Sequence, residues 1–131
     1  MFEPDTLADL IQNLDDIRVL CVGDVMLDQY VMGKVERVSP EAPIPVLRID
    51  QNMAMGGGAG NVAANIVSLG ANVDLVSVIG GDDDGRELRD LLGSNIKLHA
   101  DLIIEESRAT TTKMRFISEG QHLLRADRED V

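Results

Sequence analysis

Two short apolar runs, separated by a helical pattern, constrain the fold of this chain most strongly. The runs IRVLCVG (residues 17–23) and NVDLVSVIGG (residues 72–81) are nearly continuous in apolar residues, as are the buried strands of parallel sheets. The segment between them carries apolar residues that share one helical face: Ala59, Val62, Ala63, Ile66 and Leu69. A strand, a helix and a second strand in this order predict an α/β fold with parallel core strands.

The alternation of helix and strand continues after the second run. RELRDLLG (residues 86–93) predicts a short helix, and Asp82–Asp84 just before it are typical of a helix start rather than of a metal site. Near the beginning of the chain, Pro4–Asp16 has apolar residues at helical spacing and predicts a short amphipathic helix. Three more strands are expected: His99–Ile104, Thr110–Ile117 and Gln121–Ala126.

Two further segments do not fit the buried core. QYVMGKVERVS (residues 29–39) and IPVLRIDQN (residues 44–52) alternate polar and apolar residues, which is typical of half-exposed antiparallel strands. They predict a small antiparallel β flap at about residues 29–50, inserted after the first core strand. The sequence ends after a strand, without a further helix to cover that face of the sheet. We therefore expect residues 1–131 to be the N-terminal part of a larger domain.

The charge of the chain limits its partners. A formal net charge of −11 argues against binding nucleic acid or an anionic membrane, both of which need basic protein surface. No run approaches the ~18 apolar residues of a membrane span, and the acidic N-terminus is unlike a signal peptide. These features predict a soluble, cytoplasmic protein without a membrane partner. The single Cys21 and the isolated His99 and His122 favour neither a disulfide nor a metal site.

The glycine-rich stretch MAMGGGAGNVAANIVSLG (residues 53–70) leads directly into the first predicted core helix. Such a loop binds nucleotide phosphate when lysine and a hydroxyl residue follow its last glycine, but Asn61 and Val62 follow Gly60 here. Residues 58–63 fit the dinucleotide pattern Gly-x-Gly-x-x-Ala, yet they follow the flap and not the first core strand, as that pattern requires. The stretch therefore indicates something other than a nucleotide-phosphate loop.

The spacing within residues 57–80 resembles the first signature of the ribokinase / phosphofructokinase-B sugar kinases. The matching positions are paired glycines, an asparagine, a small residue and two later glycines: Gly57, Gly58, Asn61, Ala63, Gly70 and Gly80. Most of the remaining chain, including VGDVMLDQYVMGKVERVSPEAPIPVLRI, SRATTTKMRFI and QHLLRADRE, resembles the kinase half of bacterial heptose-7-phosphate kinase / heptose-1-phosphate adenylyltransferase. The resemblance implies a ribokinase-like fold and phosphorylation of D-glycero-D-manno-heptose 7-phosphate at its anomeric oxygen, for ADP-heptose and lipopolysaccharide.

The resemblance also implies roles for individual residues. Asp28, in GDVMLD, takes the place of a carboxylate that accepts hydrogen bonds from sugar hydroxyls. Gly57 and Gly58 lack a Cβ, so their backbone can approach the sugar and donate N–H hydrogen bonds to it. Asn61, in the first turn of the helix, can both donate to and accept from a hydroxyl. The alternatives are a turn residue for Asp28 and a helix cap for Asn61.

Lys113 and Arg115 alternate along TTTKMRFI, so their side chains point to the same face of one strand. With the nearby Arg108 they form a local positive group, which predicts contact with the phosphate of the substrate. The alternative is a solvated strand face whose cations pair with the abundant acidic residues. Arg37, on the flap, is predicted to close over the substrate, although surface arginines are common.

Nothing in residues 1–131 matches the glycine-rich anion hole and the base aspartate with which family members transfer the γ-phosphoryl group. We therefore expect no catalytic residue here, a base aspartate beyond residue 131, and no ATP-binding part. ATP and Mg²⁺ are expected for the complete enzyme and neither on this chain. The family commonly pairs through its flap, which predicts a homodimer. Alternatives are a kinase for another sugar or sugar phosphate, and a non-catalytic sugar-binding or dimerisation module.

Overall fold

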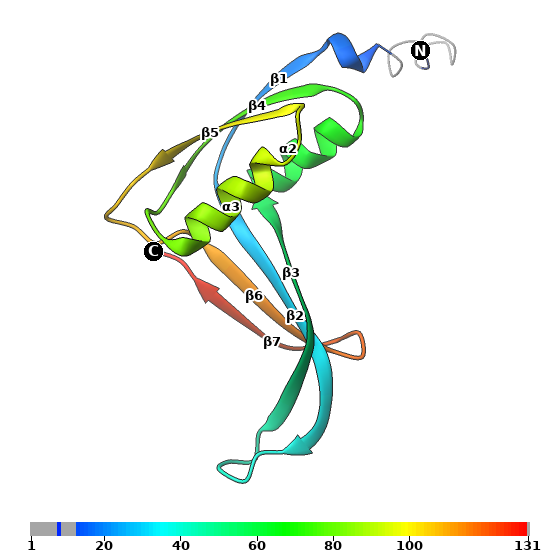
Figure 1. Ribbon diagram of the computed structural model, residues 1–131, viewed down its shortest axis with the longest axis vertical. Coiled ribbons are helices and arrows are strands. Elements are labelled where there is room, and N and C mark those ends of the chain that lie inside the picture. Colours follow the sequence, from blue (N-terminus) through cyan, green and yellow to red (C-terminus); the bar gives the residue numbers. More distant parts are fainter. Residues whose placement is uncertain (1–7, 9–12, 131) are drawn as a thin grey trace, which may run out of the picture.

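The structure of the protein is a computed structural model that describes residue 8 and residues 13–130. Its elements form two sheets, one with strand order β1-β4-β5 and one with order β3-β2-β6-β7, and the second extends away from the helices (Figure 1). The elements in chain order are η1 (Leu14–Asp16), β1 (Arg18–Val22), β2 (Val25–Val38), β3 (Pro45–Gly58), α2 (Ala59–Ser68), β4 (Asn72–Ile79), α3 (Asp83–Gly93), β5 (Leu98–Ile104), β6 (Thr112–Ser118) and β7 (Gln121–Arg128).

The three-stranded sheet confirms the predicted α/β core. β1 pairs in parallel with β4, and β4 pairs in parallel with β5. Because parallel neighbours need a crossover connection, a helix stands before β4 and another stands before β5. The second helix begins at Asp83, earlier than the sequence predicted, because the acidic residues before RELRDLLG form its first turn.

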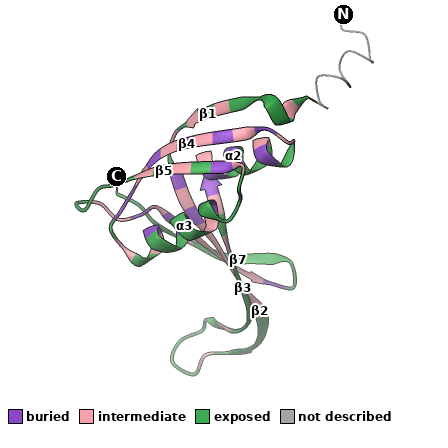
Figure 2. Cartoon of the chain, turned by 45° about the horizontal axis from the view of Figure 1, so that its top comes forward, coloured by how far each residue is buried: buried purple, intermediate pink, exposed green. Residues whose placement is uncertain are grey.

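Both helices lie against one face of this sheet, where the core is formed (Figure 2). Along β4, buried side chains alternate with half-buried ones. The buried members of the cluster come from the sheet, from both helices and from β2: Val25, Leu27, Ala63, Val67, Val73, Leu75, Ile79, Leu88, Leu92 and Leu98. The first apolar run forms the predicted strand, but the expectation that it is buried was wrong: Val19 and Cys21 of β1 are half-buried, and Leu20 and Val22 are 67% and 70% exposed.

The predicted flap is present and larger than expected. β2 and β3 are antiparallel partners from Val25–Gly58 to Val38–Pro45, so their strands extend past residues 29–50 at both ends. β6 adds to β2 in parallel, and β7 adds to β6 in antiparallel orientation. The flap is therefore a four-stranded mixed sheet. The alternation of polar and apolar residues indicated a strand in each segment. The sequence of neither strand indicates the pairing of β2 with β6, because the two strands are more than eighty residues apart.

The acidic run Asp82–Asp84 begins α3, as the sequence predicted. Asp82 is the N-cap residue, and its Oδ1 accepts a hydrogen bond of 2.9 Å from the N–H of Gly85. The same carboxylate accepts 2.6 Å and 3.0 Å hydrogen bonds from the hydroxyl and the N–H of Thr110. Asp84 accepts a 2.6 Å hydrogen bond from the hydroxyl of Thr112, the first residue of β6. These contacts join the helix to the flap.

The surroundings of Asp82 change its pKa. Burial acts to raise this pKa, but the hydrogen bonds from Thr110 and Gly85 and the charge of Arg128 outweigh burial and lower the pKa from 3.8 to about 2. Arg128, the last residue of β7, forms ion pairs with Asp82 and Asp84. The ionised form of Asp82 is thus the one that the folded protein favours.

Most of the predicted N-terminal helix, Pro4–Asp16, lies outside the described residues. Within the described part of this segment, Leu14–Asp16 forms a short 3-10 helix. Among the described residues, none of the helices has the length and hydropathy needed to cross a membrane.

Candidate functional site

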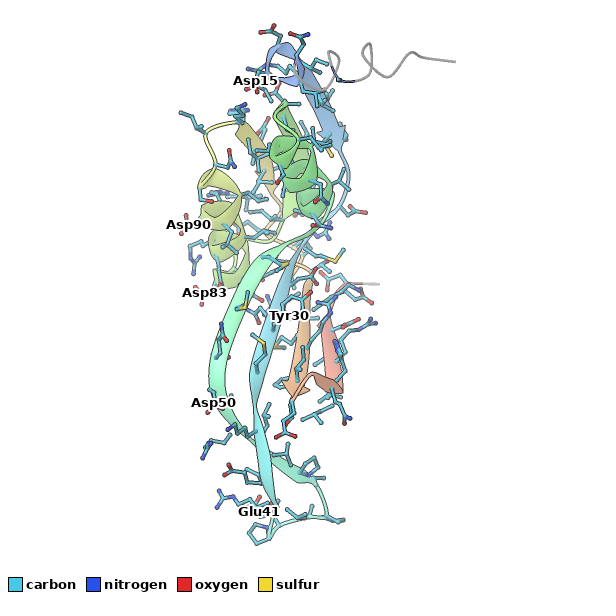
Figure 3. The ribbon with its side chains drawn as sticks, turned by 90° about the vertical axis from the view of Figure 1, so that its right-hand side faces the viewer. Asp15, Tyr30, Glu41, Asp50, Asp83 and Asp90 are labelled. Carbon is cyan, nitrogen blue, oxygen red and sulfur yellow. The ribbon has the colours of Figure 1, made fainter. Side chains whose placement is uncertain are left out.

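One face of the flap gathers four polar side chains near the end of the sheet that adjoins the helices. The parallel pairing of β2 and β6 places Asp28 opposite Lys113 and Tyr30 opposite Arg115. Directly opposite residues point to the same side of a sheet, as do residues two positions apart. The four side chains therefore share one face, and Tyr30 lies nearer to the helices than Asp50 and Glu41 do (Figure 3). Leu27, on the other face, is fully buried in the core.

Asp28 and Arg115 form the most enclosed ion pair of this face. Arg115 Nη1 donates a 2.6 Å hydrogen bond to Asp28 Oδ1, and the two side chains are 20% and 14% exposed. The guanidinium also lies over the ring of Tyr30, 5.1 Å from its centroid. The hydrogen bond to Asp28 is the largest influence on the pKa of Arg115 and raises it above its ordinary value. Arg115 is therefore held in place from two sides.

Gly57 lies directly against the carboxylate of Asp28. A Cβ at Gly57 would stand 2.8 Å from Asp28 Cγ and 2.7 Å from Met26 Cγ, closer than real Cβ atoms approach other atoms. The next residue, Gly58, is the N-cap of α2 with a φ of 58°, which favours glycine. The two glycines thus let the chain turn from β3 into the helix while the backbone stays beside Asp28.

Lys113 is paired with acidic residues of β7 and its continuation. Its Nζ lies 3.4 Å from Asp127 Oδ2 and 3.7 Å from Glu129 Oε2. Asp127 also forms a 3.0 Å ion pair with Nε of Arg125. The positive group expected around Lys113 and Arg115 is therefore not a free cationic patch, because both of these cations already have carboxylate partners.

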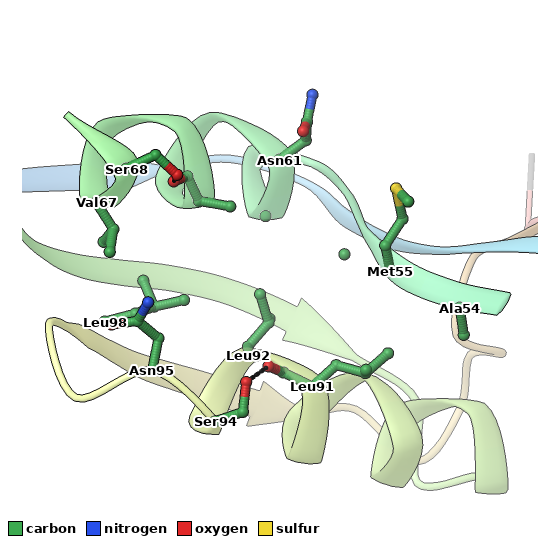
Figure 4. A pocket seen from close by; sticks show the side chains of 13 residues that line it. Ala54, Met55, Asn61, Val67, Ser68, Leu91, Leu92, Ser94, Asn95 and Leu98 are labelled. Atoms are coloured by element: carbon green, nitrogen blue, oxygen red, sulfur yellow. Dashed lines mark hydrogen bonds between the residues drawn. The ribbon is translucent and has the colours of Figure 1, made fainter.

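Asn61 lies in the first turn of α2, where the sequence placed it, and its residue is exposed. It stands at the rim of a cleft of about 310 Å³ between α2 and α3, whose floor is formed largely by apolar side chains such as Leu92 and Leu98. The amide of Asn61 points away from these side chains (Figure 4). The cleft is lined by four polar side chains, Asn61, Ser68, Ser94 and Asn95, but by no charged one, so we regard the flap face as the stronger candidate site.

The structure does not bring Arg37 to the other predicted residues. Arg37 is exposed and lies near the far end of β2, where it pairs with Val46. Nine residues separate it from Asp28, which corresponds to about 30 Å along an extended strand. Within one chain in this conformation, the two side chains do not meet.

The arrangement suits a polyhydroxyl ligand. A carboxylate offers only acceptors to hydroxyl groups, whereas a backbone N–H group is a donor. Among the described residues, no group of three or more His, Cys, Asp or Glu side chains is placed to hold a metal ion. Sequence reasoning missed Tyr30 and Asp127, which hold Arg115 and Lys113; only the register of β2, β6 and β7 reveals them.

Solved structures with the same arrangement of elements define the class to which this fold belongs. A carbohydrate kinase from Agrobacterium tumefaciens superposes with a TM-score of 0.67 at 21% identity, over 85% of this chain and 35% of that one. Arabidopsis thaliana ribokinase, solved with ribose and ATP, gives a TM-score of 0.60 at 20% identity, over 86% of this chain and 35% of that one. The fold is that of the ribokinase-like kinases.

The family follows from the sequence itself. Residues 16–131 match the model of the pfkB family carbohydrate kinases, and the chain belongs to this family. It is similar to the bifunctional protein HldE of Paramagnetospirillum magneticum, with 50% identity over 129 residues, 98% of this chain and 26% of the relative. HldE of Caulobacter vibrioides is 46% identical over 126 residues, 96% of this chain and 26% of the relative. The chain thus spans about a quarter of these relatives.

Proposed function

We propose that the chain is the sugar-binding part of an ATP-dependent carbohydrate kinase that phosphorylates D-glycero-D-manno-heptose 7-phosphate at its anomeric oxygen. The observation that carries this proposal is the Asp28 carboxylate, held by Arg115 on one side and placed against the bare backbone of Gly57 on the other. Membership of the pfkB family supports a sugar kinase, and the similarity to HldE proteins supports a heptose phosphate as its substrate.

In this proposal Asp28 accepts hydrogen bonds from sugar hydroxyls, and the N–H groups of Gly57 and Gly58 donate to sugar oxygens. Asn61 contacts the same sugar from the first turn of α2. Lys113 contributes a point charge to the distant phosphate, in competition with its acidic partners.

The proposed contact of Arg37 with the substrate requires a displacement of the flap end, because Arg37 lies far along β2 from Asp28.

The same end of the flap supports the proposed homodimer. An apolar hollow of about 390 Å³ is lined there by Ile44, Pro45, Leu47, Phe116, Leu123 and Leu124. Ile44 and Leu124 are 56% and 59% exposed, so a second copy would remove apolar surface from water.

ATP and Mg²⁺ belong to the complete enzyme in this proposal. The described residues do not fit them: the glycine turn lacks the lysine and hydroxyl of a phosphate loop, and the described acidic residues are not gathered for a metal ion. We therefore assign the chain binding and orientation of the sugar, and we place the base aspartate and the nucleotide site outside residues 1–131.

Calorimetric titration of the chain with heptose 7-phosphate, ribose and fructose 6-phosphate tests this function. The proposal predicts binding of heptose 7-phosphate in preference to the other two sugars. Equal binding of all three favours a kinase for another sugar, and absent binding contradicts the sugar site. A parallel assay with radiolabelled ATP is expected to give no phosphorylated heptose from the isolated chain; a labelled product would place catalytic residues within it.

A further inference from the structure

We infer that Arg115 is a positioning residue for Asp28 and does not bind the phosphate of the substrate. This inference rests on the proposed function, since it concerns how the sugar-binding carboxylate is held. It revises the expectation from the sequence, in which Arg115 and Lys113 together contact the phosphate.

The two oxygens of the Asp28 carboxylate face two different neighbours. Arg115 Nη1 donates to Oδ1 at 2.6 Å, whereas Oδ2 is the oxygen that lies where a Cβ of Gly57 would stand. One oxygen is therefore engaged by the arginine, and the other is turned toward the glycine backbone. This orientation leaves Oδ2 to meet a ligand hydroxyl beside the N–H groups of the glycine turn.

The guanidinium of Arg115 is also held in place without any ligand. Arg115 lies over the ring of Tyr30 at 5.1 Å and is only 20% exposed. Its strand pairs with β2 in a register that places Arg115 opposite Tyr30 and its side chain beside Asp28. A group held by a ring and a carboxylate loses little conformational entropy when the sugar binds, which is what positioning requires.

Binding of a phosphate by Arg115 would also separate the ion pair that it forms with Asp28. A phosphate that takes the Arg115 guanidinium would leave the carboxylate of Asp28, only 14% exposed, without its partner. Removing one partner of an enclosed ion pair is strongly unfavourable, and the carboxylates of Asp28 and Asp127 would both repel the phosphate. Lys113 differs, because its partners Asp127 and Glu129 lie 3.4 Å and 3.7 Å away.

Binding calorimetry with two ligands separates the two roles. The ligands are heptose 7-phosphate and the same heptose without its phosphate. We expect Arg115→Gln to weaken binding of both by about tenfold, the size of one charged hydrogen bond. The matched control is Lys113→Gln, two residues away on the same face, which is expected to weaken only the phosphorylated ligand. If Arg115→Gln instead weakens only heptose 7-phosphate, Arg115 binds the phosphate and the inference is wrong.

A double-mutant cycle with heptose 7-phosphate gives a second, independent result. In an Asp28→Asn background, Arg115→Gln is expected to cause less than about a twofold further loss, because the group it positions has gone. A full additional loss in that background contradicts the inference. Should Arg115→Gln not fold, as judged by circular dichroism, Arg115→Lys replaces it. Lysine keeps the positive charge but lacks the planar set of donors of the guanidinium, so a positioning role predicts weaker binding of both ligands. Wild-type affinity of Arg115→Lys for either ligand would contradict the inference.

The same titrations distinguish a failure of the inference on Arg115 from a failure of the proposed function. If the wild-type chain binds neither ligand, or if Asp28→Asn binds like wild type, the proposed sugar site itself is wrong. If the wild-type chain binds and Asp28→Asn does not, the sugar site stands, and the Arg115 variants alone decide the inference.

Discussion

Gly57 of β3 faces Asp28 of β2 so closely that the carboxylate fills the space a side chain would need. Their elements are antiparallel partners in the flap, and Gly57 is buried although it stands at the end of the strand. This contact explains why a glycine is required here: the position is defined by the close approach of the Asp28 carboxylate and not by a turn alone.

Gly57→Ala is therefore expected to weaken sugar binding by about tenfold or more, because the new methyl group displaces Asp28 from its place. Calorimetry with heptose 7-phosphate measures the effect. Gly93→Ala is the matched control, since a Cβ at Gly93 meets nothing within 4 Å. The control is expected to bind like wild type, and wild-type binding by Gly57→Ala as well would show that the contact does not matter.

Substitution of Leu27, on the opposite face of β2, is expected to lower the stability of the protein. Leu27 is fully buried in the core cluster, so Leu27→Ala removes packed methyl groups and is expected to lower the free energy of unfolding by about 2–5 kcal/mol. Urea denaturation followed by circular dichroism measures this difference. Leu20→Ala, at a site that is 67% exposed, is the control and should change stability by less than about 0.5 kcal/mol. Equal effects at the two sites would contradict the assigned core.

The lowered pKa of Asp82 predicts that the stability of the protein depends on pH. Its pKa is about 2 in the folded protein and 3.8 ordinarily, so the unfolded chain takes up this proton at the higher pH. The stabilisation is fully present above about pH 4 and is lost as the pH falls through about 2. Denaturation curves across this range are expected to show a steeper loss for the wild type than for Asp82→Asn. Identical pH dependence in the two proteins would mean that Asp82 is not held as described.

The apolar hollow at the flap predicts the oligomeric state. Leu124→Lys places a charge on this surface and is expected to convert a dimer into monomers in sedimentation velocity experiments, without loss of helix content. Ile96→Lys, at a fully exposed site outside the flap, is the control and should leave the dimer intact. A wild-type chain that sediments as a monomer at all concentrations would contradict the proposed pairing.

Much of the fold was predictable because its signals are local. The apolar runs, the helical face from Ala59 to Leu69 and the alternating flap segments each reflect burial on one or two sides of a single element. The pairing of β6 with β2 was not predictable, since nothing in either segment encodes its partner. The four-stranded flap therefore appeared only in the structure.

The site shows the same division. The signature glycines and Asp28 were identified from the sequence, and the structure brings Gly57 and Asp28 together. The environment of Arg115 was not predictable, because its contacts with Asp28 and Tyr30 depend on strand register. An excess of acidic residues indicated that cations would find partners, but not which ones.

The most direct test of the central claim is to map heptose 7-phosphate onto the chain by amide chemical shifts in nuclear magnetic resonance spectra. We expect the largest changes at Gly57, Gly58 and Asn61 and at Lys113 and Arg115 across the flap face. Changes concentrated instead in the cleft between α2 and α3, around Leu91 and Ser94, would contradict it, as would a spectrum that the sugar phosphate leaves unchanged.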